Sequence, residues 1–335
     1  MANIVFSEGS GLQDSIYGKV QSPVKMFIEK KGEAFEAQSI LPEIFNMQKS
    51  THFGETITSM TAMDGFKPVG EGGNYPTDGM QEGYKKFLEH MTWKDSFALT
   101  AEIIDDSKTM ELRKKPAGFI TAYHRTREKF GAALLGGAIT GKSAIEFSGR
   151  KFDTTCADGQ ALFALKHPAK IKGKPQSNMF ADAFSEDALA AAECAMQDYR
   201  GDNEEVLDVS PTTIIIPNDY QLKKQVFAVI GADKDPSTAN NGFNFLFGRW
   251  QVIVWNYLNQ FITAGTKPWL LLDKNYNEQY GGAVWFDRQP LKVKSVIDEN
   301  TDNNVWKGSA RYIGGFNDWR AFCAGGIAGG TELIQ

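Results

Sequence analysis

The chain of 335 residues has little of what several classes of protein require. It has only three cysteines (Cys156, Cys194 and Cys323), and so odd and sparse a count argues against a disulfide framework and for a reducing compartment. Its net charge of −5 argues against general binding of nucleic acid through phosphate contacts. No apolar run approaches the roughly 20 residues that span a bilayer, and the first residues show no signal-peptide pattern. We therefore expect a soluble protein that is made in a cytoplasm.

Residues typical of catalysis are equally sparse. The four histidines have no other ligand-type residue at a spacing typical of metal sites: His52, His90, His124 and His167. Asp105 and Asp106 fit charges at the start of a helix better than paired carboxylates for acid–base chemistry. No nucleophile elbow or Cys/His arrangement is present. The sequence predicts no catalytic residue, no cofactor and no metal.

One nucleotide-binding pattern does occur. Residues 136–143 match G-x-x-x-x-G-K-[ST], the phosphate-binding P-loop, and the apolar run before Asp273 resembles the strand whose acid would hold magnesium. A P-loop needs a strand before the glycines and a helix directly after them. Here the pattern follows a predicted helix, and Gly149 interrupts any helix beyond it. We prefer a chance match, with a P-loop-type nucleotide hydrolase as the alternative hypothesis.

The most distinctive feature that is present is a glycine-punctuated excursion over residues 53–97. Ile57 on an outward limb and Phe87 on a return limb indicate a long β-hairpin, and residues 70–76 are typical of a turn. An active-site lid or a plain exposed loop is the alternative, but two such long limbs favour packing against an outside partner, most simply a second copy. The candidate subunit-contact residues are Gly70, Gly72, Gly73, Tyr75, Lys85 and Trp93.

The rest of the chain indicates an α+β fold. Residues 1–50 predict an extended arm with short helical pieces. A long helix is expected after a cap at residues 105–107, with Pro116 in its first turn and its end near Gly136. The second half predicts a helix that opens at Ser185, another over residues 219–230, and strands near residues 213–216, 251–255, 269–273, 283–287, 291–296 and 305–312.

Two packing expectations accompany these elements. Four aromatic residues in one short stretch are expected in the core rather than at an interface: Phe243, Phe245, Phe247 and Trp250. Cys194 is expected to be a small packing residue on a helix face.

Several stretches resemble a known family. They are Phe152-Asp153-Thr154-Thr155 within residues 140–159, Ala161-Leu162-Phe163 followed by His167-Pro168, the run over residues 210–217, and Gly314-Gly315-Phe316-Asn317-Asp318-Trp319-Arg320. Their order resembles the major capsid protein of tailed bacteriophages, with the Hong Kong coliphage-type fold and the Mu-like branch of head subunits. The resemblance covers nearly the whole chain.

The resemblance implies an α+β fold with an N-terminal arm (1–52), an extended β-loop across a neighbouring subunit (53–97), a peripheral domain with a spine helix (98–180), an axial domain (181–282) and return strands shared by both domains (283–335). It implies a structural, non-enzymatic protein in the virion that self-assembles, without a cofactor, into an icosahedral head around double-stranded DNA.

The implied partners are copies of the chain in hexamers and pentamers, a separate scaffolding protein, a portal, decoration proteins, and packaged DNA without sequence-specific contact; no membrane is implied. The arm is too short for a fused scaffolding segment. The subunit crosslink of some members is not carried over, because nothing marks one lysine of the loop. An encapsulin-like compartment shell, which shares the fold, is a further alternative.

Overall fold

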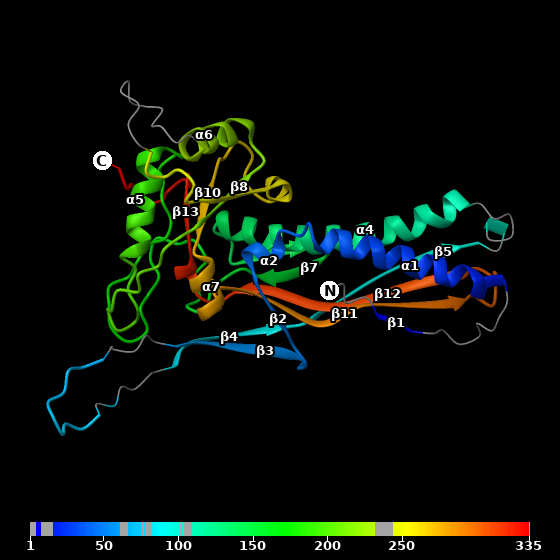
Figure 1. Cartoon of the computed structure of the whole chain (residues 1–335), viewed down its shortest axis with the longest axis horizontal. Coiled ribbons are helices and arrows are strands. Elements are labelled where there is room, and N and C mark those ends of the chain that lie inside the picture. The colour runs from blue at the N-terminus through cyan, green and yellow to red at the C-terminus, as the bar shows by residue number, and fades with distance from the viewer. Residues whose placement is uncertain are drawn as a thin grey trace.

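The computed structural model describes residues 5–7, 16–60, 66–75, 77, 82–100, 102–103, 109–231 and 244–334. Figure 1 shows two long helices over one face of a long sheet, a second compact part at one end of that sheet, and a β-hairpin on the opposite side from the helices. No helix in these residues is both apolar enough and long enough to cross a bilayer. The α+β class that the sequence predicts is confirmed.

The long sheet is organised around two antiparallel strands that pair along most of their length. Its strands are β1 (Val5–Ser7), β2 (Asn46–Lys49), β5 (Met91–Leu99), β11 (Ala283–Ile297) and β12 (Asn304–Phe316). The order is β1-β11-β12-β5, and β2 pairs in parallel with the other end of β11. The two runs expected at residues 283–287 and 291–296 form this one strand β11. The pairing is irregular between Asp287 and Lys292, where Pro290 has no N–H to donate.

One face of this sheet is covered by α4 (Thr109–Ile139), the expected long helix. Pro116 lies inside α4, so its expected place in the first turn is wrong, and the expected cap at residues 105–107 lies outside the described residues. Contacts with the sheet hold this part of the helix: the Lys115 Nζ donates to the Ala98 carbonyl at 2.8 Å, and Phe119 lies against Phe97 with ring centroids 5.2 Å apart. Tertiary packing outweighs the local preference of proline.

The N-terminal arm differs most from expectation. It is a 21-residue helix, α1 (Ile16–Glu36), which packs along α4, and a short α2 (Leu41–Ile44) follows. Val24 and Ile28 of α1 are buried. Gly18 and Pro23 weaken the helical signal in the sequence, and the helix forms because its apolar side packs on α4.

The second part is built on a four-stranded sheet with helices beside it. Its elements are α5 (Glu186–Gln197), β8 (Thr213–Pro217), α6 (Tyr220–Ile230), β9 (Gln251–Trp255), η1 (Asn256–Gln260), β10 (Trp269–Leu272), α7 (Lys274–Tyr280), η2 (Trp319–Ala321) and β13 (Phe322–Gly325). The strand order is β13-β10-β8-β9. The expected cap holds, because the Ser185 hydroxyl accepts from the Ala188 N–H at 3.1 Å. The predicted helices and strands of this half are confirmed.

One packing expectation is wrong in part and the other is wrong. Phe245 and Phe247 are about half exposed, at 49% and 48%, whereas Trp250 is half-buried and packs against the core, and Phe243 lies outside the described residues. Cys194 is exposed, whereas Cys156 and Cys323 are buried; all three are free thiols. In both cases the residue type predicts burial, but its neighbours in the folded chain leave it facing outward.

Candidate assembly site: the β-hairpin and its base

The expected hairpin consists of β3 (Gly54–Met60) and β4 (Glu82–Glu89), paired antiparallel from Gly54↔Glu89 to Met60↔Glu82. It is shorter than residues 53–97, because from Met91 the chain belongs to β5 of the long sheet. The described tip residues are all exposed, and Phe66 and Tyr75 are 109% and 96% exposed. These large apolar side chains make almost no contact with the rest of the chain, and their contact with a second copy stays a prediction.

The tip glycines have the conformations of a turn. Gly72 has a φ of +77°, which favours glycine, and the Gly73 N–H donates to the Gly70 carbonyl at 2.9 Å. A Cβ on Gly70 or Gly72 would meet nothing. Lys85 lies further along, on β4, where it pairs with the exposed Glu82 at 2.6 Å. These candidates and Tyr75 are therefore accessible, and their contact with a second copy stays a prediction.

Trp93, the sixth candidate, packs within its own subunit. Its ring stacks on Tyr312 with centroids 5.0 Å apart and planes 8° apart, and it lies 5.3 Å from Phe130 of α4. The Trp93 Nε1–H donates to the Tyr312 carbonyl at 3.4 Å. The residue was expected on the hairpin, and its place on β5 gives it this packing role instead. A contact of the exposed part of Trp93 with a second copy stays a prediction.

The base of the hairpin is held by two lysines. The buried Lys86 of β4 pairs with Asp153 of β7 (Arg150–Asp153) at 3.0 Å and donates to the Thr155 carbonyl. Burial would raise the pKa of Asp153, but the Thr155 N–H and Lys86 outweigh it and lower that pKa. From the body, the Lys170 Nζ donates to the Glu82 carbonyl at 2.9 Å and to that of the next residue.

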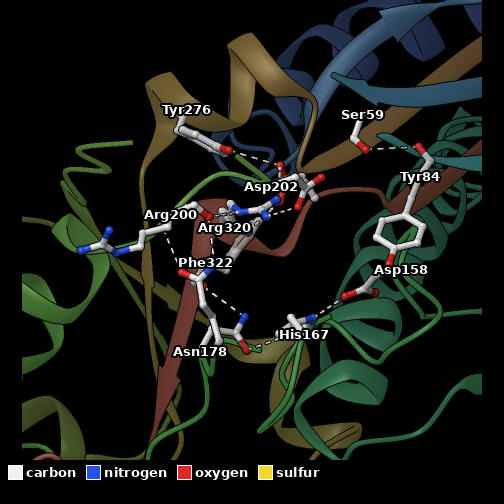
Figure 2. A network of polar contacts seen from close by, with 12 residues as sticks. Ser59, Tyr84, Asp158, His167, Asn178, Arg200, Asp202, Tyr276, Arg320 and Phe322 are labelled. Atoms are coloured by element: carbon white, nitrogen blue, oxygen red, sulfur yellow. Dashed lines mark hydrogen bonds and ion pairs between the residues drawn. The ribbon is translucent and has the colours of Figure 1, made fainter. Parts of the chain in front are cut away.

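A small polar hollow, with a cavity volume of about 10 Å³, lies between the hairpin base and the body. Ser59 and Tyr84 line it from the hairpin, and the Ser59 hydroxyl donates to the Tyr84 carbonyl at 3.2 Å (Figure 2). The body contributes Ala157, Asp158, Pro168, Asp202, Asn317, Asp318, Trp319 and Arg320. Burial raises the pKa of the Tyr84 hydroxyl most, and the negative charge of Asp202 raises it further.

Arg320 is the centre of the network in Figure 2. Its Nη2 pairs with the Asp202 Oδ1 at 2.9 Å, its Nη1 pairs with the Asp318 Oδ1 at 3.3 Å, and its Nε donates to the Arg200 carbonyl at 3.0 Å. Burial alone would lower the Arg320 pKa, but the carboxylates raise it. Because the Tyr276 hydroxyl also donates to Asp318 at 3.2 Å, this network joins helix α7, the turn at η2 and the loop that carries Asp202.

His167 joins the same wall of the hollow. Its Nδ1 lies 2.6 Å from the Asp158 carboxylate and its Nε2 lies 3.1 Å from the Asn178 Oδ1. The Asn178 amide nitrogen donates to two carbonyls, which makes its oxygen the acceptor. Both ring nitrogens therefore face an acceptor oxygen. The ring also stacks on Trp319, at 4.4 Å between centroids.

The P-loop pattern has the wrong surroundings for phosphate. Residues 136–139 are the last turn of α4, and β6 (Ala144–Phe147) follows instead of a helix. A Cβ on Gly136 would lie 2.5 Å from Phe261, so this glycine serves close packing. Asp273 caps α7 by accepting from the Tyr276 N–H at 3.0 Å and also accepts from the Ser210 N–H. The preferred interpretation, a chance match, agrees with this geometry.

No cluster of three or more His, Cys, Asp or Glu suited to a metal occurs within the described part of the chain. The arrangement of Figure 2 was not predicted from the sequence, although Asn317, Asp318 and Arg320 stand in one of the stretches quoted above. A signal was present in the sequence, since charged residues inside an apolar, aromatic-rich segment indicate paired burial.

The chain shares its fold with a solved phage structure. A structure from Mycobacterium phage Patience matches with a TM-score of 0.51 and 10% identity, covering 100% of this chain and 96% of that one. Two others align less closely. The capsid of a native GTA particle has a TM-score of 0.49 and 12% identity, with 86% and 89% coverage. The virus-like particle from Pyrococcus furiosus has 0.46 and 10%, with 92% and 97% coverage. At 10% identity, the match with the Patience structure shows a shared fold and nothing more.

The fold places the chain in a class of mixed α+β proteins that have a long sheet, a spine-like helix and a projecting β-hairpin. Comparison with curated protein sequences gave no match. The model of the family described as phage capsid protein matches residues 85–325, and the chain belongs to this family. It is therefore a structural protein of a capsid shell, and its place is the capsid of a virion.

Proposed function

We propose that the chain is the major head subunit of a tailed phage, in the Mu-like branch. The family match supports the first part, and the resemblance over residues 140–159, 210–217 and 314–320 supports the branch. In this proposal, hexamers and pentamers of the chain close an icosahedral shell around double-stranded DNA. The subunit contributes geometry and contact area, and performs no chemical step.

The proposal includes the partners that such a head needs. They are a separate scaffolding protein, a portal, decoration proteins on the shell, and DNA held without sequence-specific contact, with synthesis in the host cytoplasm. It also keeps the division into arm, extended loop, peripheral domain, axial domain and return strands. The loop is narrowed to the hairpin of residues 54–89, because its second limb ends there.

The hairpin is the observation that carries the proposal. Its tip exposes Phe66, Val69 and Tyr75, while its base is fixed to the body by Lys86 and Lys170. A fixed base with an exposed apolar tip suits a contact between subunits, because apolar side chains that lie in water are stabilised when a second surface covers them.

The test removes the tip and keeps the base. Residues 61–81 are replaced by Asn-Gly, which closes a two-residue turn between the paired Met60 and Glu82. We expect an unchanged thermal melt, because this segment adds little to the core, and no shells by negative-stain electron microscopy under conditions in which the full-length chain forms them. Shells built from the shortened chain would refute the role of the hairpin. If the shortened chain is unfolded, the claim that residues 61–81 add little to the core is refuted.

A further inference from the structure

Asn317 carries a buried amide that has no hydrogen-bond partner in the described part of the chain. The residue is 2% exposed, and neither its Oδ1 nor its Nδ2 meets another protein group there. Its backbone is fully bonded, because the N–H donates to the Gly282 carbonyl at 2.7 Å and the carbonyl accepts from the Ala157 N–H at 3.0 Å. Leaving a buried amide unpaired costs free energy, so such groups nearly always bind either a protein group or an ordered water.

The fold places this amide beside the hairpin. A Cβ on Gly315 would lie 2.8 Å from Leu88 of β4, and Asn317 follows two positions later, on the same side of the chain. On β4 the residues of this side alternate in the same way, because Lys86 and Leu88 are buried and Tyr84 lines the hollow. Asn317 lines the hollow from the body. The amide and the Tyr84 ring therefore belong to the two facing walls of one small cavity.

The hollow has the size and the polarity that one water molecule requires. A water needs a cavity of about 10–15 Å³ and two to four polar partners. The cavity volume here is about 10 Å³, which meets the lower limit. The Tyr84 ring points from the hairpin toward Asp158 (Figure 2), and its hydroxyl bonds to no other described residue. Arg320 pairs with the Asp202 Oδ1, so the Asp202 Oδ2 can accept a further hydrogen bond.

We propose that this hollow binds one water molecule, which links the Tyr84 hydroxyl of the hairpin to the Asn317 amide of the body. The Asn317 Nδ2 and the Tyr84 hydroxyl donate to its oxygen, and the Asp202 Oδ2 accepts from it. The water adds a solvent-mediated connection to the two direct ones that Lys86 and Lys170 make at the hairpin base. The inference does not depend on the proposed function.

A cation suits the same cavity less well. The Asn317 Nδ2 and the Tyr84 hydroxyl are hydrogen-bond donors, and a donor needs an acceptor, which a cation is not. Arg320 already pairs with both Asp202 and Asp318, so a positive charge faces these two carboxylates. A water satisfies donors and acceptors together without adding charge.

A high-resolution crystal structure of the unassembled subunit tests the site directly. We expect a density peak between the Tyr84 hydroxyl and Asn317, about 2.7–3.2 Å from the Asn317 Nδ2. A second crystal, grown in rubidium chloride, distinguishes a cation, because only a bound cation gives an anomalous peak. An anomalous peak at this position overturns the inference, and so does a cavity without density.

Replacing Asn317 by leucine gives a test whose sign is decisive. Leucine has a similar volume and no polar atom. If the amide had no partner, this change would leave stability unchanged or raise it. If the amide binds a water that also serves Tyr84, the lost hydrogen bonds should lower the melting temperature by roughly 2–6 °C. An unchanged or higher melting temperature overturns the inference.

Tyr84→Phe is the milder variant, because it removes one oxygen and keeps the ring that lies 5.7 Å from the Lys170 Nζ. Hydrogen exchange of the β3 and β4 amides should become roughly threefold faster or more, while exchange in α5 stays unchanged. Tyr220→Phe, at a side chain 76% exposed, is the matched control and should change neither region. Unchanged exchange in the hairpin of Tyr84→Phe would contradict the proposed link.

Combining the two substitutions separates a shared water from two independent effects. Once Asn317→Leu has removed the water, the Tyr84 hydroxyl has lost its partner already. The double variant should therefore lose clearly less stability than the sum of the two single losses. Additive losses would show that Tyr84 and Asn317 act independently, which overturns the inference.

Discussion

Truncating Trp319 to alanine tests whether the closing turn is a true part of the core. Trp319 is 3% exposed, stacks on His167 at 4.4 Å and meets Tyr199 edge-on at 5.0 Å. The Arg320 guanidinium lies 5.0 Å from the Trp319 ring centroid. The indole thus supports the wall of the hollow as well as the core behind it.

The expected loss of stability follows from this burial. A tryptophan buries about 200 Å², which at about 25 cal/mol per Å² corresponds to about 5 kcal/mol. Measured truncations of buried aromatic residues to alanine cost about 3–5 kcal/mol, because the cavity collapses only in part. We expect Trp319→Ala to lose about 3–5 kcal/mol of unfolding free energy, a large share of the roughly 5–15 kcal/mol that a domain has.

Urea unfolding of the unassembled subunit, followed by far-ultraviolet circular dichroism, measures this loss. The midpoint should fall with an unchanged slope, because the surface exposed on unfolding is the same. Trp319→Phe keeps a ring against His167 and should lose clearly less. Tyr220→Ala, at a side chain 76% exposed, is the matched control and should change stability by under about 0.5 kcal/mol. A loss below about 1 kcal/mol for Trp319→Ala would refute the burial argument.

Three further predictions use other parts of the molecule. Lys86→Met should cost about 1–2 kcal/mol in urea unfolding, because the Thr155 carbonyl loses its donor and Asp153 its partner; Lys85→Met, on the exposed face of the same strand, should cost almost nothing. His124 lies on α4 with its ring stacked on Phe35 of α1, and burial and Arg127 lower its pKa to about 4. The unfolded chain, with a histidine pKa of about 6.5, then binds more protons, so stability falls as the pH drops from 6.5 to 4, by up to about 3 kcal/mol; His124→Gln should flatten this part of the pH profile, and a parallel profile would contradict the argument. Finally, calorimetry should detect no ATP binding by the chain or by Lys142→Ala, and heat that disappears in the variant would revive the P-loop hypothesis.

Several elements could be predicted because their signals are local. Ser185 before an acidic turn indicates the start of α5, and the β-branched run that ends at Pro217 indicates β8. The end of the hairpin could not be predicted in this way. β4 and β5 are separated only by His90, and apolar and polar residues alternate in both strands, so the sequence has no local signal for the boundary. Only the pairing of β5 with β12 separates the projecting hairpin from the body.

The sequence by itself determined the class of the protein: a mildly acidic α+β chain without catalytic motifs, with the order of elements typical of a capsid subunit. The charge, the α+β class and the lack of catalytic motifs depend on composition, spacing and turn residues, whereas the capsid class depends on the resemblance of the quoted stretches to a known family. The tertiary structure alone decided that α1 is a helix, that Trp93 packs inward, and that Arg320 joins Asp202 and Asp318. It also decided that Tyr84 and Asn317 line one hollow. Such features depend on contacts between residues far apart in the chain, because register and packing, rather than local preference, determine which side chains meet.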